Sequence, residues 1–398
     1  MIFRNRALLA VSVAVAAAYT GIGMVVPVRV LYAQSHGASL GVIGAMASSY
    51  LLANFAFQYP AGALSDRIGR KPLMLTGLVV QAILTLVYLA VSDPLLFVGL
   101  RFLEGIVGAA VLSPARALIA DAVPEDQRGE AYGIFSAFFN AGFLLGPGIG
   151  GLLASTGYSS AFIGSFACRL GAAVIVAIVI HERTPARRRK ALGIPTTHRG
   201  LFTRALLGAY ILAFGDYLWL GFDMTLMPLW LRHHLGASIA AIGLAYATWA
   251  VPSMIVSPIG GRIADRVRRS HLILIFGLAQ VPFYVAYGLL TQLAIVIIAI
   301  GLHSAVYSLT MPAVDAYLAS ASPPDARARA QSLYSSVGLA SAFLASAVLP
   351  ALYAVNYRLP IFAVGALFGL CIVVGGLLVR RSEFALPQTV AGVQAAGQ

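Results

Sequence analysis

Charged residues are scarce in this sequence: only 10% of its 398 residues are Asp, Glu, Lys or Arg, while 60% are hydrophobic. A soluble globular domain has about 25% charged residues, so the composition excludes that class. Cysteine is nearly absent as well, and Cys168 and Cys371 both fall within apolar stretches. Two such cysteines form no disulfide framework and are typical of small packing residues. The mean hydropathy of +0.86 instead indicates a chain that crosses a membrane repeatedly.

The sequence also lacks the motifs of the common enzyme classes. It contains no metal-ligand cluster, no P-loop and no nucleophile elbow, and His233 and His234 have no acidic partner in their predicted loop. The stretch from Gly146 to Gly151 fits the dinucleotide pattern GxGxxG, but it follows an apolar segment instead of a strand. We therefore expect no enzymatic activity, no cofactor and no metal.

Long uncharged runs dominate the chain, at 72–92, 131–168 and 359–379. A bilayer core takes about 20 helical residues to cross, so these runs predict two single spans and a helical pair. Spans must be helical because lipid offers the backbone no hydrogen-bond partners. The predicted spans are 7–33, 40–64, 72–92, 95–120, 130–155, 159–181, 205–231, 238–263, 271–290, 293–319, 330–355 and 359–380.

The basic residues are distributed unevenly along the chain. Most of the 27 lie in the termini and in the connections on the same side, whereas the opposite loops hold only Arg232 and Arg358. This asymmetry places both termini in the cytoplasm. It also accounts for the net charge of +13 without a nucleic acid partner. The basic, apolar N-terminus resembles a signal peptide, but its apolar character continues to Leu31, which favours a retained helix in a bacterial inner membrane.

A repeat emerges when the chain is shifted by 199 residues. "GALSDRIGRKPLM" from Gly62 then lies on "GRIADRVRRSHLI" from Gly261, and Pro124 falls on Pro323. The repeat predicts an all-α membrane protein with two parallel six-helix bundles: an N-terminal bundle at 1–181, a basic cytoplasmic linker at 182–204, a C-terminal bundle at 205–381 and a cytoplasmic tail at 382–398. Such duplicated bundles bind substrate near the midplane and work by alternating access.

Three motifs resemble the major facilitator superfamily, most closely its twelve-helix drug:proton antiporters. "GALSDRIGRKPLM" resembles the family's loop between helices 2 and 3, and "RFLEGIVGAA" from Arg101 resembles its helix 4 motif. The helix 5 antiporter motif is matched at Gly133, Gly142, Gly146, Pro147, Gly150 and Gly151. The resemblance implies the major facilitator fold and, through helix 5, export.

Glycines 142, 146 and 150 fall four apart, where missing side chains allow a neighbouring helix to approach closely. Pro147 removes one backbone donor and favours a bend. Simple helix packing would explain the stripe. The resemblance implies instead that it faces the eighth helix across the interface of the two bundles.

The loop motif either marks topology or forms a cytoplasmic latch, consisting of Gly62, Asp66, Arg67, Gly69, Arg70 and Asp121. A carboxylate can lie at a helix N-terminus, and an arginine can bind a second carboxylate with two hydrogen bonds. The resemblance implies that Asp66 meets the start of the eleventh helix and pairs with Arg70, which reaches Asp121. Such a latch would close the inner side when the cavity opens outward.

Ionisable residues inside the spans are functional candidates because lipid exposure would cost several kcal/mol. We select Asp216, Asp223, Glu104 and His303 as candidates for proton coupling. Arg101 and Glu104 are three residues apart and can pair, whereas Arg169 either reaches an acid such as Glu104 or marks a separate site. Arg29 lies near the outer end of its span, where we expect it to snorkel to the interface.

Further polar and aromatic residues could line a cavity, although each could equally pack helices. The substrate candidates are Arg101, Arg169, Asn54, Gln58, Asn140, Tyr217, Trp219, Tyr246, Trp249 and Gln280. The sequence favours a monomeric secondary transporter that exports a small hydrophobic or amphiphilic compound in exchange for protons. Alternatives are a uniporter or proton symporter of a metabolite, sugar or lipid, and a transporter-like membrane sensor.

Overall fold

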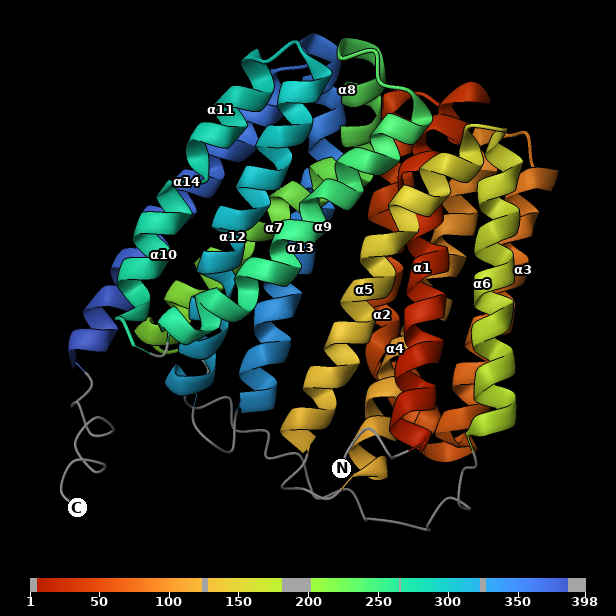
Figure 1. Cartoon of the computed structure of the whole chain (residues 1–398), viewed down its shortest axis with the longest axis horizontal. Helices are drawn as coiled ribbons and strands as arrows, with labels where there is room; N and C mark the ends of the chain where they lie inside the picture. Colours follow the sequence, from red (N-terminus) through yellow and green to blue (C-terminus); the bar gives the residue numbers. More distant parts are fainter. Residues whose placement is uncertain (1–5, 124–127, 181–201, 265, 323–326, 386–398) are drawn as a thin grey trace.

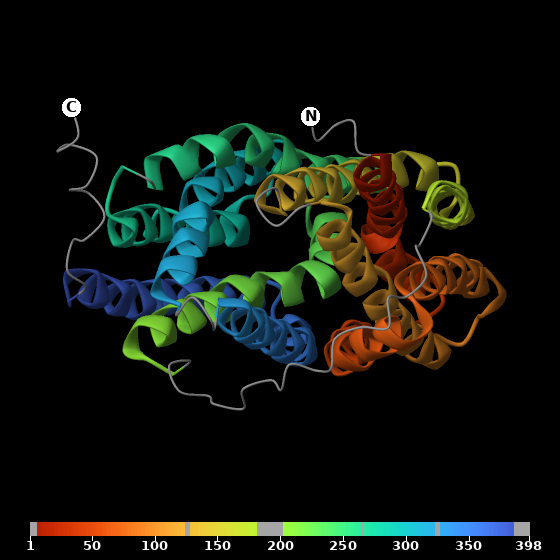
Figure 2. The ribbon, with the colours of Figure 1, turned by 90° about the horizontal axis from the view of Figure 1, so that it is seen from below.

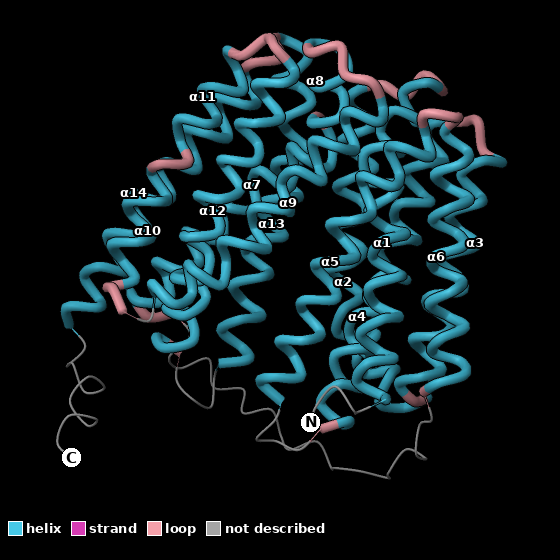
Figure 3. The backbone as a smooth tube through the Cα atoms, in the orientation of Figure 1, coloured by secondary structure: helices cyan, strands magenta, loops and turns pink. Residues whose placement is uncertain are grey.

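A computed structural model describes residues 6–123, 128–180, 202–264, 266–322 and 327–385, and every regular element in them is helical (Figure 3). The elements are α1 (Arg6–Ser35), α2 (Leu40–Ile68), α3 (Arg70–Ala90), α4 (Pro94–Ala122), α5 (Arg128–Ala154), α6 (Tyr158–Val179), α7 (Arg204–Thr225), α8 (Met227–His234), α9 (Ile239–Ala264), α10 (Arg269–Leu278), α11 (Val281–Leu289), α12 (Leu293–Ala321), α13 (Arg327–Val355) and α14 (Leu359–Ala385). The described residues contain 12 helical segments long and apolar enough to span a membrane, which agrees with the predicted number.

Two of the predicted spans are not continuous helices. The span predicted at 205–231 breaks at Leu226, between α7 and α8, and the span predicted at 271–290 breaks between α10 and α11. The prediction of uninterrupted helices was therefore wrong at these two places. A proline explains each break, because Pro228 and Pro282 lie in the first turn of α8 and α11, where a missing N–H is tolerated.

The helices form two groups, α1–α6 and α7–α14, which lie side by side in Figures 1 and 2. α1 begins and α14 ends at the same end of the bundle, which we call the terminal end. The opposite end is called the far end. In Figure 1 the two groups approach each other at the far end, whereas their lower ends lie apart.

Small residues close the far end between the two groups. Between α2 and α13, Ser48 Oγ lies 2.8 Å from Ser346 Oγ. Between α5 and α9, a Cβ placed on Gly151 would lie 2.8 Å from the Cα of Gly243. Gly44 of α2 also packs against Ser346. The offset of 199 residues between the two halves of the sequence aligns Gly44 with Gly243. The two contacts are therefore equivalent, and together we call them the far-end seal.

The glycine stripe of α5 faces α1, so the expectation that it faces the eighth span was wrong. A Cβ on Gly142, Gly146 or Gly150 would lie 2.1–2.5 Å from a backbone carbonyl oxygen of α1. Residues four apart share one face of a helix, and this face lies within the N-terminal group. Gly151 is one residue further, about 100° around the helix, and it contacts α9, as do Pro147 and Gly148.

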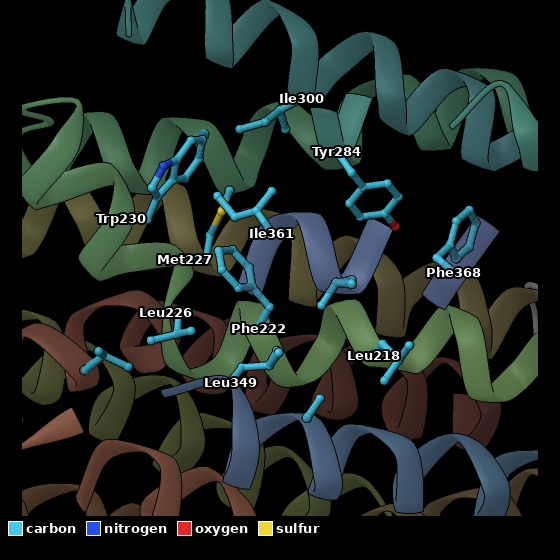
Figure 4. Close-up of a cluster of buried hydrophobic side chains, with 14 of the residues drawn as sticks. Leu218, Phe222, Leu226, Met227, Trp230, Tyr284, Ile300, Leu349, Ile361 and Phe368 are labelled. Carbon is cyan, nitrogen blue, oxygen red and sulfur yellow. The ribbon is translucent and has the colours of Figure 1, made fainter. Parts of the chain in front are cut away.

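Aromatic and aliphatic side chains fill the core of the second group (Figure 4). The break at Leu226 lets α8 turn inward, and it buries Trp230 at 1% exposure beside the ring of Tyr287. Phe222 of α7 is fully buried and stacks on Trp219. Burial of each large apolar side chain stabilises the fold by about 1.5–3 kcal/mol. This core holds α7 and α11 in place around the candidate site.

Candidate functional site

Three arginines converge on one glutamate in the first group of helices. Glu104 of α4 accepts from Arg29 Nη2 at 3.2 Å and from Arg101 Nη1 at 2.8 Å, and Arg169 Nη1 lies 3.7 Å away. The four side chains come from α1, α4 and α6 and are only 2–6% exposed. Removing one partner from a buried ion pair costs about 3–5 kcal/mol, so the cluster is energetically important. We call these four residues the Glu104 cluster.

Neighbouring polar groups hold the cluster in position. The Tyr88 hydroxyl donates to Glu104 Oε2 at 3.3 Å, and the Arg29 guanidinium lies 5.3 Å from the centre of the Tyr88 ring. Arg169 donates to Thr85 Oγ1 at 2.6 Å. Tyr88 and Thr85 belong to α3, while Arg101 lies 4.0 Å from the centre of the Tyr50 ring of α2, so both helices hold the arginines in place.

A cavity borders this cluster where the two groups of helices meet. Its lining consists of Val26, Arg29, Val30, Ile43, Met46, Ala47, Arg101 and Met224. Met224 belongs to α7, so the cavity has walls from both groups. Two guanidinium groups on a mostly apolar wall suit a ligand with an apolar body and a few polar atoms. We call this cavity the interface cavity.

The structure corrects one sequence interpretation and resolves another. Arg29 does not snorkel to the membrane surface, because it turns inward to Glu104 and is 6% exposed. The snorkelling prediction was wrong because a position near a helix end gives no information about the partner on α4. Arg169, for which the sequence left two possibilities, reaches Glu104 from α6.

A second cavity surrounds Asp216 within the second group. It is lined by Leu212, Asp216, Gln280, Tyr307, Thr310, Met311, Val314, Tyr334, Phe368 and Ile372. Gln280 lies in the break between α10 and α11 and donates to Thr310 Oγ1 at 3.1 Å. The broken helix therefore places an amide beside a carboxylate in an otherwise apolar setting, and such a carboxylate is a functional candidate.

Asp223 lies two turns from Asp216 on α7 and next to Met224, which lines the interface cavity. The Tyr246 hydroxyl of α9 donates to the Asp223 backbone oxygen at 3.0 Å. Among the described side chains, the ion pairs of Arg29, Arg101 and Arg169 all involve Glu104. Among the described side chains, therefore, no ion pair joins either aspartate of α7 to these arginines.

His303 lies in an aromatic cage and not beside Glu104. Its Nδ1 is 3.0 Å from the Tyr287 hydroxyl, and Phe283 stacks on its ring at 5.1 Å. Trp249 meets the same ring edge-on at 5.2 Å. All these neighbours belong to the second group of helices. The structure therefore does not bring the two titratable residues of α4 and α12 together in one cluster.

The remaining cavity candidates are divided between packing and exposed positions. Asn54 donates to the Gly105 carbonyl at 3.3 Å and accepts from Gln58, within the first group. Asn140 is exposed on α5. The Tyr217 ring lies 2.7 Å from the position of a Cβ on Gly338, so it packs α7 against α13.

The latch motif is only partly described. The side chains of Asp66 and Asp121 lie outside the described residues, and Gly133 of the helix 5 motif lies in the first two turns of α5. Gly69 joins α2 to α3 with φ of 103°, and its N–H donates to the Ser65 carbonyl at 3.0 Å. Only glycine adopts this backbone region readily, so Gly69 sets the turn. Gly62 lies in the last two turns of α2, and Arg67 is exposed beside Gly69, while Arg70 begins α3.

Sequence comparison decides the family. Residues 11–225 and 206–395 match the Major Facilitator Superfamily. The chain belongs to this superfamily of transporters. The twelve spans, the two groups of helices and the cavity between them agree with membership. The chain is a multi-pass membrane protein of this superfamily.

Similar proteins cover part of the chain in sequence and nearly all of it in fold. An uncharacterized MFS-type transporter, MJ1560, of Methanocaldococcus jannaschii is 39% identical over 34% of this chain and 35% of its own length. Quinolone resistance protein NorA of Staphylococcus aureus is 27% identical over 41% of this chain and 42% of its own length. The chain thus spans well under half of these relatives. A bacterial homolog of the human lysosomal transporter Spinster has a TM-score of 0.79 at 16% identity, covering 95% of this chain and 97% of its own.

Proposed function

We propose that this transporter exports a small amphiphilic compound across the bacterial inner membrane in exchange for protons, by alternating access. The observation that carries the proposal is the interface cavity, which has walls from both groups of helices and lies beside the residues of the far-end seal. A cavity in this place can exchange its exposure between the two membrane faces when the groups tilt. The similarity to the quinolone resistance protein NorA supports export.

Proton coupling is assigned to the carboxylates of α7. Asp216 lies in a mostly apolar cavity with Gln280 and Tyr307, and Asp223 neighbours the interface cavity through Met224. Both lie on the helix that connects the two cavities. A carboxylate on this helix that gains and loses a proton changes the local charge by one unit, and this change can alter how α7 packs against the first group.

The terminal end is assigned to the cytoplasm on the basis of the basic residues in its connections. With this orientation, we interpret the structure as a state closed on the outer side, because the far-end contacts are formed. In the outward-open state the latch motif would join the groups at the terminal end. We expect Asp66, Arg70 and Asp121 to form its ion pairs in that state.

A reversible crosslink across the far-end seal tests alternating access. We would replace Cys168 and Cys371 with serine, introduce Ser48→Cys and Ser346→Cys, and reconstitute the protein in proteoliposomes with an imposed pH gradient. The two serine oxygens are 2.8 Å apart, so the cysteines can form a disulfide. Oxidation should stop flux of an amphiphilic dye, and a reductant should restore it.

The single variant Ser48→Cys serves as the matched control, because it undergoes the same treatment without the possibility of a crosslink. Flux that continues in the fully crosslinked double variant would exclude alternating access at this seal. Dye-dependent proton movement in the uncrosslinked protein supports antiport, whereas flux that ignores the pH gradient supports a uniporter. The absence of flux for anionic, neutral and cationic dyes alike would favour a membrane sensor.

A further inference from the structure

The Glu104 cluster carries more positive than negative charge. Arginine stays protonated in proteins, so the three guanidinium groups contribute three positive charges. Glu104 contributes at most one negative charge, which leaves an excess of at least two positive charges in either state of the carboxyl group. Buried charges are normally compensated, because burial without a partner is costly. Among the described side chains, no second carboxylate approaches these arginines.

The unused hydrogen-bonding capacity points in the same direction. Nε of Arg29 and Nε of Arg169 are buried and donate to no described group. Arg29 also lines the interface cavity together with Arg101. Buried donors without acceptors are uncommon in folded proteins, and each one needs an explanation. Arg169 does not line the cavity, so a ligand with acceptor oxygens there would provide an acceptor for Arg29 and the missing negative charge.

The second half of the chain shows that the fold does not need these arginines. The offset of 199 residues aligns Tyr88 with Tyr287 and Glu104 with His303. The two pairs make the same contact: the Tyr88 hydroxyl lies 3.3 Å from Glu104 Oε2, and the Tyr287 hydroxyl lies 3.0 Å from His303 Nδ1. The equivalents of the three arginines are apolar: Arg29, Arg101 and Arg169 correspond to Pro228, Ile300 and Phe368. A helical scaffold of the same design is therefore stable without any cation at these positions.

We infer that the interface cavity binds an anionic group, a carboxylate or phosphate, of an amphiphilic substrate, with Arg29 and Arg101 contacting the acid oxygens. This inference rests on the proposed transport function and names its substrate class. Val26, Val30 and Met46 form the apolar part of the cavity wall, which the apolar part of the molecule would meet. Arg169 is not one of the cavity-lining residues and acts as a positioning residue that holds Glu104 from α6.

Equilibrium binding to three probes with one apolar body tests the inference. We would use pyrenebutyrate, pyrenebutanol and pyrenebutyltrimethylammonium with the full-length protein in zwitterionic lipid nanodiscs, subtracting binding to empty nanodiscs. A charge-assisted hydrogen bond is worth about 1.5–3 kcal/mol, so the acid should bind about tenfold or more tightly than the alcohol. The cation should bind more weakly than the alcohol.

Two substitutions relate this preference to the cluster. Arg29→Gln and Arg101→Gln should each bring the affinity for the acid close to that for the alcohol, while the alcohol binds as before. Arg116→Gln is the matched control, because this arginine also lies on α4 but is exposed near the terminal end. Glu104→Gln removes the negative charge of the cluster, so its net charge becomes more positive by one unit and the preference for the acid should increase.

Equal affinity of the unmodified protein for all three probes would overturn the inference, even if no variant folds. A preference that survives both arginine substitutions would also overturn it. Nanodiscs of anionic lipid distinguish a lipid headgroup from a free acid: loss of pyrenebutyrate binding there supports the anionic site and identifies a lipid as its occupant. Binding is measured without flux, so transport of a cationic dye without acid preference would overturn this inference and leave the proposed function intact.

Discussion

The substitution Gly243→Ala adds one methyl group to the far-end seal and should shift the equilibrium from far-end-closed to far-end-open molecules. In the structure, a Cβ on residue 243 would lie 2.5 Å from the Pro147 carbonyl oxygen and 2.9 Å from the Cα of Gly151. Ordinary Cβ contacts lie at 3.4–4 Å, so Gly243→Ala cannot be accommodated while α9 and α5 stay in place. The clash disappears if the two groups of helices separate at the far end.

The size of the shift follows from the cost of overpacking. An added methyl group in a tightly packed contact costs about 1–3 kcal/mol. The seal is present only when the far end is closed, so the whole cost falls on that state. Since about 1.4 kcal/mol corresponds to a factor of ten, the ratio of far-end-closed to far-end-open molecules should fall about 5- to 150-fold.

Gly150→Ala is a matched control with an equally severe clash. Its Cβ would lie 2.1 Å from the Met24 carbonyl oxygen, but Met24 belongs to the same group of helices. Tilting of the groups cannot relieve that contact. Gly150→Ala should therefore lower the unfolding temperature without changing the balance of states, whereas Gly243→Ala should change the balance with little loss of stability.

Spin labels on each end of the bundle provide the assay. With Cys168 and Cys371 replaced by serine, labels at the exposed Thr156 and Val355 report the far end, and labels at the exposed Thr76 and Ala319 report the terminal end. In Gly243→Ala the far-end distances should lengthen and the terminal-end distances shorten. Unchanged distance distributions, or a loss of stability as large as that of Gly150→Ala, would refute the reasoning.

Three further outcomes are expected. Asp66→Asn should abolish flux while the amount of protein in the membrane stays normal, because the latch loses a charge; normal flux would contradict the latch. Gly69→Ala should lower the free energy of unfolding by about 1–3 kcal/mol, because its φ of 103° is unfavourable for any residue with a side chain, and thermal unfolding measures this. Asp216→Asn should leave substrate exchange active but remove its dependence on a pH gradient, and a retained dependence would assign coupling to another residue.

Much of the architecture is predictable from the sequence because the bilayer imposes it. A span needs about 20 apolar residues, so uncharged runs identify most helices without knowledge of their neighbours. The breaks in the seventh and ninth spans were missed although Pro228 and Pro282 are visible in the sequence. Each proline lies inside an apolar run, and hydropathy alone does not separate a kinked helix from two short ones.

The candidate site was predictable only in part. Glu104 and Arg101 share one helix, and a spacing of three residues brings them together regardless of the tertiary fold. Arg29 comes from α1 and Arg169 from α6, and their convergence on α4 depends on how three helices pack. The direction of the α5 glycines depends on the same packing, since neighbouring positions on one helix face different helices. The offset of 199 residues carried a usable signal, because it aligns Tyr88 with Tyr287 but three arginines with apolar residues.

The positions of the seal and of the interface cavity explain how one could control the other. Ile43, Met46 and Ala47 line the cavity, and they lie on α2 among the residues that form the seal, Gly44 and Ser48. A ligand shifts an equilibrium only if it contacts one state more favourably than the other. An acid held by Arg29 stays with the first group in both states, whereas its contact with Met224 of α7 exists only while the far end is closed. The apolar body of the substrate, and not its acidic group, is therefore the part that distinguishes the two states.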